Sequence, residues 1–282
     1  DSFHYYMGPK YFPELGYTEL YKCAAVAEIE LGSGAKVARR VYRDLATNES
    51  VAGQTLLRTP ELCKGRFAPE RWRQFVHDID YFRHRIARWE ITMQDWGYNA
   101  TPVWNLGGSL LAGSGPVDEA RFGLSTLLDV PCLLAMWGFV AWAFGWRTLC
   151  VGLVFWGTNP WSGYNWTGGS ILRQEWLVAS VIGLCLLRKR KPVWAGATIT
   201  YAALLSIFPG FLAVGVGLKS IAGAWRERRL VLEPEHRRLL LGALLALVLV
   251  VPAATYRAGG VSAWVSAGEP AARCRKSVIL SP

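Results

Sequence analysis

The sequence predicts an all-α polytopic membrane protein, in which an extracytoplasmic helical loop domain precedes about six transmembrane helices. Residues 1–123 carry mixed charge with scattered apolar residues, whereas residues 124–257 contain long apolar runs with few charges. An apolar run of roughly 18 or more residues is long enough to cross a bilayer. Basic residues gather in short clusters beside these runs, which is typical of membrane topology. The net charge of +10 is therefore not assigned to nucleic-acid binding.

Both ends of the chain look incomplete. The sequence opens on Asp1 within a polar, aromatic segment, so we expect a truncated chain with at least one transmembrane helix upstream. Residues 258–282 are predicted to form a polar tail that is external or disordered.

One helix of the extracytoplasmic region, residues 1–123, can be predicted in detail. Proline is favoured in the first turn of a helix, so the segment "PERWRQFVHDIDYFRHRIARW" is expected to begin a helix at Pro69. Its apolar residues recur at helical spacing and form one stripe: Trp72, Phe75, Val76, Ile79, Phe82 and Ile86. Such a helix either lies in the membrane interface or packs on its own domain.

Six apolar segments are expected to form the transmembrane domain, residues 124–257. They are residues 124–146, 148–159, 171–187, 193–208, 210–224 and 239–256. The second is short for a span, and is either tilted or partly re-entrant. A break at Pro209–Gly210 is expected to separate the fourth span from the fifth.

The basic clusters predict the orientation. Residues 188–191 read "RKRK" and residues 225–229 read "WRERR", and short loops rich in lysine and arginine stay in the cytoplasm. Both clusters share that side if the fourth and fifth spans form a hairpin. Residues 1–123 then face outward. We expect an integral protein of the bacterial inner (plasma) membrane, with residues 1–123 extracytoplasmic.

The cysteines divide by their surroundings. Cys132, Cys150 and Cys185 fall in apolar segments and are expected to be small buried hydrophobic residues. Cys23 and Cys63 lie in the external region, where an oxidising compartment would let them pair. The alternative is two free thiols. No CxxC occurs, so a cysteine zinc site is not expected.

Ionisable residues at membrane depth are costly and are candidates for function. Asp129 either faces a cavity at the outer leaflet or caps a neighbouring helix end. Arg173 and Glu175 lie at the outer mouth of the third span, and residues two apart on a helix point to opposite sides. Arg173 is a candidate phosphate clamp, because a guanidinium fork matches a phosphate. Its alternative is snorkelling to the interface.

The opening stretch, residues 1–23, is dense in candidate chemistry. Asp1, His4, Lys10, Glu14 and Glu19 fall within 19 residues. Carboxylates there are candidates for a general base, and the alternative is a solvated segment with an aromatic belt. No cofactor is assigned with certainty.

A divalent metal ion is a further candidate. His77, Asp80 and His84 share one helix face at a loose spacing, and the alternative is a wet helix surface. The sequence contains no P-loop, GxGxxG, GxSxG or HExxH pattern.

Three phrases carry a resemblance: "FHYYMGPKYFPELGYTELY", "GYNATPVW" and "FWGTN…WTGGSILRQEW". They resemble a group of bacterial multi-span membrane proteins. The layout is similar to the GT-C superfamily of membrane glycosyltransferases, which take a sugar from a polyprenyl-phosphate carrier. In that superfamily an essential acid lies near the exit of the first span.

The resemblance implies a site assembled from the opening stretch and the outer loops. Asp1 would be the general base, and His4 or Glu14 would orient the acceptor or hold a metal. Lys10 and Arg173 would neutralise the leaving lipid phosphate, and aromatic residues would stack on sugar rings. The substrate-binding residues would be Lys10, Tyr5, Asn99, Asp129, Asn159, Trp166, Arg173 and Glu175.

The implied partners are the lipid bilayer, a polyprenyl-phosphate sugar, and a glycan or lipid acceptor, with no nucleic acid. The rival class is non-enzymatic: a transporter or a structural subunit of an envelope complex. Asp129 and Arg173 would then line a path or a docking surface.

Overall fold

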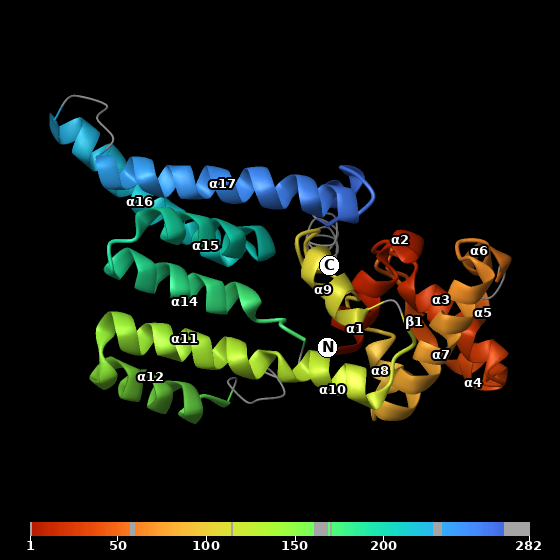
Figure 1. Cartoon of the computed structure of the whole chain (residues 1–282). Helices are drawn as coiled ribbons and strands as arrows, with labels where there is room; N and C mark the ends of the chain where they lie inside the picture. Colours follow the sequence, from red (N-terminus) through yellow and green to blue (C-terminus); the bar gives the residue numbers. More distant parts are fainter. Residues whose placement is uncertain are drawn as a thin grey trace, which may run out of the picture. The chain divides into compact units, whose positions relative to one another are not determined.

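The computed structural model describes residues 2–56, 60–113, 115–160, 169, 171–227 and 233–267, and it is mostly helical (Figure 1). The chain divides into two compact units. The first is formed by Asp1–Ser125 with Thr255–Pro282, and the second by Thr126–Ala254. The residues that follow Ala254 therefore group with the start of the chain.

The first unit is built of short helices and one strand hairpin. Its helices are α1 (Ser2–Lys10), α2 (Phe12–Leu15), α3 (Leu20–Glu30), α4 (Gly34–Arg39), α5 (Gly53–Leu56), α6 (Glu61–Lys64), α7 (Pro69–Arg85), α8 (Trp89–Thr92) and α9 (Trp104–Ala112), and α10 (Glu119–Leu127) begins in it. Strands β1 (Val41–Arg43) and β2 (Ser50–Ala52) pair antiparallel, with Tyr42 opposite Val51.

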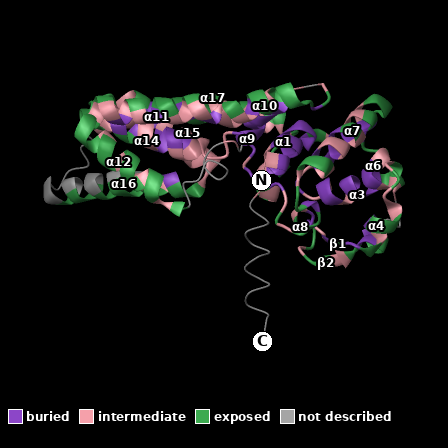
Figure 2. Ribbon diagram, turned by 90° about the horizontal axis from the view of Figure 1, so that it is seen from below, coloured by how far each residue is buried: buried purple, intermediate pink, exposed green. Residues whose placement is uncertain are grey.

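The core of the first unit is aromatic. Figure 2 shows buried residues gathered along α1, α3 and α7. The Phe82 ring on α7 lies 5.4 Å from that of Phe3 and 5.6 Å from that of Tyr6, both on α1. The Tyr11 and Phe75 rings meet edge to face at 5.0 Å. Such pairs stabilise a core beyond the area that they bury.

Helix α7 begins at Pro69, as predicted. Four residues of the apolar stripe are buried in the first unit: Trp72, Phe75, Ile79 and Phe82. The stripe packs on its own domain, which was one of the two alternatives. Its apolar face is therefore not free to lie in a membrane interface.

A disulfide bond joins α3 to α6. Cys23 and Cys63 are fully buried, and their sulfur atoms are bonded. This is the pair that the sequence proposed, so the alternative of two free thiols is wrong. The bond closes a loop between residues 40 positions apart, which limits the freedom of the unfolded chain.

The last described residues of the chain pack onto the first unit. Arg257, at the end of α17 (Pro234–Arg257), donates from Nε to Ser109 Oγ on α9 at 2.9 Å. Residues 262–267 are helical, and Trp264 Nε1 donates to Thr255 Oγ1 at 2.8 Å. As far as residue 267, the predicted tail is thus ordered. The rest of it, including Cys274, lies outside the described residues.

The second unit is formed by long helices (Figure 1). They are α11 (Asp129–Phe144), α12 (Trp146–Thr158), α14 (Glu175–Arg188), α15 (Pro192–Leu205), α16 (Ile207–Glu227) and most of α17. Each corresponds to one of the six apolar segments. The free cysteine Cys185 is buried, but Cys150 is exposed and Cys132 is half-buried, so burial was predicted correctly for only one of the three.

The predicted break at Pro209–Gly210 is wrong. Helix α16 starts before it, at Ile207, and the chain leaves the helical conformation at Ser206, where ψ is 145°. The N–H groups of the first turn of a helix have no partner within the helix, so proline, which lacks an N–H group, is tolerated there. Pro209 therefore fits inside the start of α16 and does not end a helix.

Within the described residues, two stretches are long and apolar enough to cross a membrane. They are Glu119–Phe144, which contains α10 and α11, and Pro234–Arg257. In each, only 17% of the most apolar window is buried, whereas a core helix of a water-soluble protein hides its apolar residues. Helices α12, α14 and α15 are shorter, and at about 1.5 Å per residue none alone crosses a hydrocarbon layer of about 30 Å.

Two glycines allow α15 and α17 to approach closely. A Cβ atom on Gly196 would lie 2.0 Å from the Leu239 carbonyl oxygen, and one on Gly242 would lie 1.8 Å from the Val193 carbonyl oxygen. Only a residue without a side chain fits at either position. Small residues at a helix crossing are typical of packing between membrane helices.

Replacing both bonded cysteines tests the contribution of the disulfide. The Cys23→Ser/Cys63→Ser variant should lose about 4 kcal/mol of stability, because a loop of this length becomes unconstrained in the unfolded chain. Thermal unfolding followed by circular dichroism under oxidising conditions measures the loss. Cys150→Ser, at an exposed free thiol, is the control and should leave the melting temperature unchanged. Equal melting temperatures for the two variants would contradict a stabilising bond.

The aromatic core predicts a loss of stability at high pH. Burial raises the pKa of Tyr81 to about 12, and it also raises the pKa of Tyr6, Tyr17 and Tyr42 above the ordinary value of 10.0. A phenol with a raised pKa in the folded state stabilises the fold fully below pH 10. That stability is lost as the pH rises above 10.

Denaturant midpoints should therefore fall as the pH rises above 10, and tyrosinate absorbance should appear together with unfolding. Tyr17→Phe removes one such phenol and should make the decline shallower. Tyr256→Phe, at a side chain that is 90% exposed, is the control. A midpoint that stays constant above pH 10 would contradict burial of these phenols.

Candidate functional site

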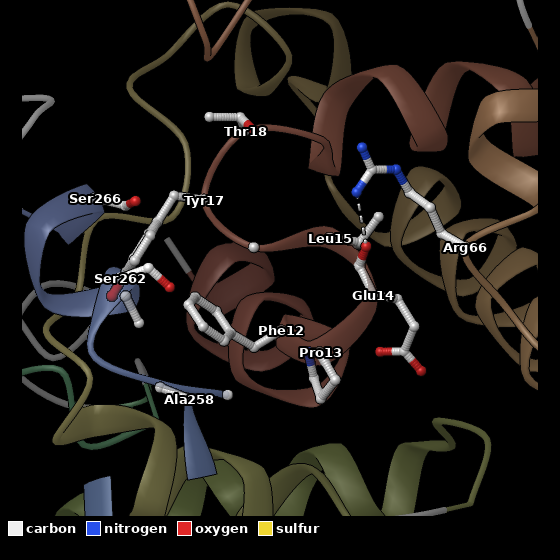
Figure 3. A pocket seen from close by; sticks show the side chains of 13 residues that line it. Phe12, Pro13, Glu14, Leu15, Tyr17, Thr18, Arg66, Ala258, Ser262 and Ser266 are labelled. Atoms are coloured by element: carbon white, nitrogen blue, oxygen red, sulfur yellow. Dashed lines mark hydrogen bonds between the residues drawn. The ribbon is translucent and has the colours of Figure 1, made fainter. Parts of the chain in front are cut away.

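An open pocket lies beside the opening stretch in the first unit (Figure 3). Its volume is about 430 Å³. One wall is α2 with the turn that follows it, and the other comes from the end of the described chain. The lining residues include Phe12, Glu14, Tyr17, Ser262 and Ser266. Segments that are distant in sequence therefore meet at this pocket.

Glu14 is the carboxylate of this pocket. Arg71 Nε donates to its Oε1 at 2.8 Å, which fixes the side chain. Its Oε2 is buried and has no hydrogen-bond partner within the described residues. A buried oxygen without a donor is costly, by about 1–3 kcal/mol. A donor group on a bound molecule would remove that cost.

Aromatic rings and hydroxyl groups form another part of the wall. The Phe12 ring packs edge to face on that of Tyr17 at 4.8 Å, and Tyr17 stacks on Tyr98 with an interplanar angle of 13°. Tyr17 OH donates to the Ala100 carbonyl oxygen at 2.9 Å, which holds the ring in place. Figure 3 shows Ser262 beside Tyr17. The pocket thus offers apolar ring surface next to polar groups.

A second cluster is a buried ion pair at the end of α1. Lys10 Nζ lies 2.6 Å from Asp78 Oδ2, and both side chains are fully buried. The ammonium also donates to the Gly115 carbonyl oxygen at 2.6 Å. Burial lowers the pKa of Lys10, and the charge of Asp78 opposes that shift.

The other groups around Asp78 complete this cluster. Tyr11 OH donates to Asp78 Oδ2 at 2.9 Å, and the Val117 N–H donates to Oδ1 at 2.8 Å. Protein groups therefore occupy the ammonium of Lys10 and both oxygens of Asp78. Lys10, which was expected to bind a phosphate, is paired in this structure with Asp78 and with the Gly115 carbonyl oxygen.

A third cluster surrounds His4. His4 Nε2 lies 2.7 Å from Tyr21 OH and 3.3 Å from Asp95 Oδ1. Tyr21 OH also donates to Asp95 Oδ1, and the Gly97 N–H donates to the same oxygen at 2.9 Å. Burial raises the pKa of Asp95, and the Tyr21 hydrogen bond opposes that shift. Histidine and carboxylate in contact form a pair able to move a proton.

The remaining predicted residues of the opening region lie apart. Asp1 lies outside the described residues. The Tyr5 ring packs on those of Trp104 at 5.4 Å and Tyr98 at 6.3 Å, so it belongs to the packing of α1. Asn99 is exposed, next to Tyr98.

The predicted residues of the second unit form contacts of their own. Asp129 is buried, and its Oδ1 accepts the Leu172 N–H at 2.7 Å, just before α14. Asp129 therefore binds the turn that precedes α14, whose N-cap residue is Gln174. Glu175, the first residue of α14, accepts a hydrogen bond from Tyr201 OH at 2.7 Å.

Arg173 and Asn159 are half-buried in the same unit, and Asn159 ends α12. Trp166 lies outside the described residues. The turn before Arg173 is strained, because Ile171 and Leu172 have φ angles of 57° and 54°, which a β-branched residue rarely adopts. Arg173 therefore follows two residues whose backbone is in the left-handed conformation.

The groups considered for a metal have other partners. Glu19 lies with Cys23 and Cys63 in the one metal-sized cluster of the described residues, but both sulfur atoms are in the disulfide bond. Thiolates are therefore not available there. His84 Nδ1 lies 2.8 Å from the Asp80 carbonyl oxygen, and His77 Nδ1 faces Asp78 at 3.3 Å. The Nδ1 atoms of His84 and His77 thus contact two different residues, Asp80 and Asp78.

Asp78, Tyr21 and Asp95 were not predicted from the sequence as site residues. Asp78 had a signal, because it lies three residues after Phe75 and four before Phe82 and so falls on the buried stripe of α7. A carboxylate on a buried face needs a partner. Asp95 had no such signal, because its partner Tyr21 lies 74 positions away in the sequence.

No family model matches the chain, and no curated protein or solved structure matches it.

The buried pair predicts a large cost for removing one partner. Asp78→Ala should destabilise the first unit by about 3–5 kcal/mol, because the Lys10 ammonium would remain buried without a counter-charge. Lys10→Met/Asp78→Leu removes both charges and should cost less than Asp78→Ala alone. Denaturant unfolding of the three proteins measures the coupling.

Asp80 provides the matched control on the same helix. Its side chain is 41% exposed and pairs with Arg83, so Asp80→Ala should cost less than about 1 kcal/mol. If the double variant were as unstable as Asp78→Ala, the pair would not be coupled.

Proposed function

We propose that the chain is part of a polytopic membrane glycosyltransferase that moves a sugar from a polyprenyl-phosphate carrier to an extracytoplasmic glycan or lipid acceptor. The observation that carries the proposal is the pocket beside α2. Glu14 lines that pocket together with aromatic rings and hydroxyl groups, and its Oε2 is buried without a hydrogen-bond partner within the described residues. The resemblance to the GT-C superfamily gives the reaction class.

The pocket has the chemistry that a sugar requires. A sugar ring has an apolar face, which packs on aromatic rings such as those of Phe12 and Tyr17, and hydroxyl groups, which donate to carboxylates. The volume of about 430 Å³ lies in the range of ligand pockets, about 300–1,000 Å³. An acceptor hydroxyl that donates to Glu14 Oε2 would satisfy that oxygen.

In the proposed transfer reaction, Asp1 acts as the base and Arg66 as the phosphate-binding cation. Asp1 removes the proton of the acceptor hydroxyl as that oxygen forms a bond to the anomeric carbon. The bond from that carbon to the phosphate oxygen breaks, and the phosphate leaves with the electron pair. Arg66 lines the pocket with an exposed side chain and lies 3.5 Å from Glu19 Oε1. It would exchange this partly exposed contact for the leaving phosphate and stabilise its charge in place of the buried Lys10.

Membrane topology supports the same proposal. Two stretches are apolar enough to cross a membrane and are mostly unburied, and the first unit contains a disulfide bond. Disulfides persist in oxidising compartments, which fits a first unit outside the cytoplasm. Glu119–Phe144 and Pro234–Arg257 would then cross a bacterial inner membrane, and the remaining apolar helices would lie within it beside them.

The enzyme is tested with full-length protein in proteoliposomes. A panel of polyprenyl-phosphate hexoses and pentoses serves as donors, and transfer to a membrane glycolipid is measured. Asp1→Ala should abolish transfer, because the base is lost. Glu14→Gln should raise the KM for acceptor about tenfold or more, the loss expected when a charge-assisted hydrogen bond becomes a neutral one.

Glu70→Gln is the matched control, because the Glu70 side chain is 80% exposed and pairs with the exposed Arg73. It should leave both kinetic constants unchanged. Full activity of Asp1→Ala, or an effect of the variants on flux across the bilayer alone, would overturn the enzyme and favour a transporter or structural subunit.

A further inference from the structure

A second cavity of the first unit lies between α4 and the loop from α7 to α8. Its volume is about 590 Å³. Cationic side chains dominate its wall: Lys36, Arg40, Arg83 and Arg88, with His84 beside them. The lining carboxylates are Glu28 and Glu90. None of these residues belongs to the site proposed for sugar transfer.

Arg40 is the buried cation of this cavity. Its side chain is only 6% exposed. Nη1 donates to Glu28 Oε1 at 2.6 Å and to Tyr42 OH at 2.9 Å. Glu28 is held in turn by Trp89 Nε1, which donates to the same oxygen at 3.0 Å. One edge of the guanidinium is therefore fixed in place by protein groups.

The other edge of the Arg40 guanidinium, formed by Nε and Nη2, is not occupied by a hydrogen bond that the structure describes. Nε is buried and has no hydrogen-bond partner within the part of the chain that the structure describes. Nη2 lies 3.8 Å from Glu90 Oε1, too far for a hydrogen bond. Nε and Nη2 point their N–H groups to the same side, so together they form a fork that matches two oxygens of one oxyanion.

The surrounding cations differ in how they are occupied. Arg83 is engaged, because Nε and Nη2 bind Asp80 and Nη1 donates to Ser33 Oγ. Lys36 and Arg88 are exposed and form no ion pair with another described residue. Glu90 is 70% exposed, so its side chain can turn into solvent. Two exposed cations, Lys36 and Arg88, therefore line the cavity beside the Arg40 fork.

We infer that this cavity binds a phosphate group, held in a fork by Nε and Nη2 of Arg40 and neutralised by Lys36 and Arg88. The bound oxyanion displaces the Glu90 carboxylate from the Arg40 edge. A phosphate suits the site because its oxygens match a guanidinium in pairs, whereas a single acceptor would leave one N–H group unsatisfied. The cavity is larger than one phosphate, so the ligand carries further atoms.

Two sources can supply the phosphate: a lipid headgroup or a small soluble molecule. The experiment uses the full chain in nanodiscs and separates the two sources. In one arm the discs contain only phosphatidylcholine, and glycerol phosphate or inorganic phosphate is added and followed by calorimetry. In the other arm phosphatidylglycerol is built into the discs. Hydrogen exchange over residues 36–43 and 83–91 reports occupancy in both arms.

We expect protection of both segments in at least one arm. Arg88→Gln should weaken binding at least about threefold, and Arg40→Lys at least about tenfold, because lysine keeps the charge but lacks the fork. Glu90→Gln should strengthen binding, since the competing carboxylate is removed. Arg39→Gln is the matched control: Arg39 is an exposed cation at the end of α4 outside the cavity, and its loss should change binding less than twofold.

Protection by soluble phosphate identifies a small ligand, and protection only by phosphatidylglycerol identifies a headgroup; either result supports the site. No protection in either arm overturns it. Equal losses for Arg88→Gln and Arg39→Gln also overturn it, because they would show attraction by net charge alone. Arg88 and Glu90 are exposed, so their variants keep the test valid even if Arg40→Lys unfolds the unit. Sugar transfer is not measured, so this result is independent of the proposed enzyme.

Discussion

The buried pair of Lys10 and Asp78 connects the parts of the first unit. The pair joins the end of α1 to the middle of α7 across 68 positions of sequence. Asp78 also holds the Val117 N–H, and Lys10 holds the Gly115 carbonyl oxygen, so the segment before α10 is fixed to the same point. Two charges without solvent are tolerable only when every partner is in place. The positions of α1, α7 and this segment are therefore mutually dependent.

This constraint also positions the pocket beside α2. Helix α2 begins two residues after Lys10, and Arg71, about two turns before Asp78 on α7, binds Glu14. Arg71 also donates to the Lys10 carbonyl oxygen, and its guanidinium lies 4.2 Å from the Tyr11 ring centroid. The ion pair and the Glu14 carboxylate are thus held by two residues of α7, Asp78 and Arg71.

Part of the fold could be predicted because it depends on local pattern. The stripe on α7 and the start at Pro69 follow from helical spacing and from the backbone of proline. The six apolar segments became helices for the same reason. Pro209 was misread because a proline is compatible with a first turn as well as with a break, and only the conformation of Ser206 decides between them.

The candidate sites were harder to predict because they depend on long-range contacts. Glu14 was recognised as an acid near the start of the chain, but its unpartnered oxygen follows from its contact with Arg71, 57 positions away. Lys10 was assigned to a phosphate because its partner Asp78 was not considered. Arg40 gave no sequence signal, since its open edge results from contacts with Glu28 and Tyr42.

The disulfide bond between α3 and α6 also reports the redox environment in which the first unit folded. Thiols in the cytosol are kept reduced, whereas thiols that have crossed a membrane become oxidised. Cys23 and Cys63 are fully buried once the unit has folded, so reductants and oxidants in solution have little access to their sulfur atoms afterwards. The redox state of these two sulfur atoms, assayed in protein taken directly from cells, is thus a durable record of the side of the membrane on which this part of the chain folded.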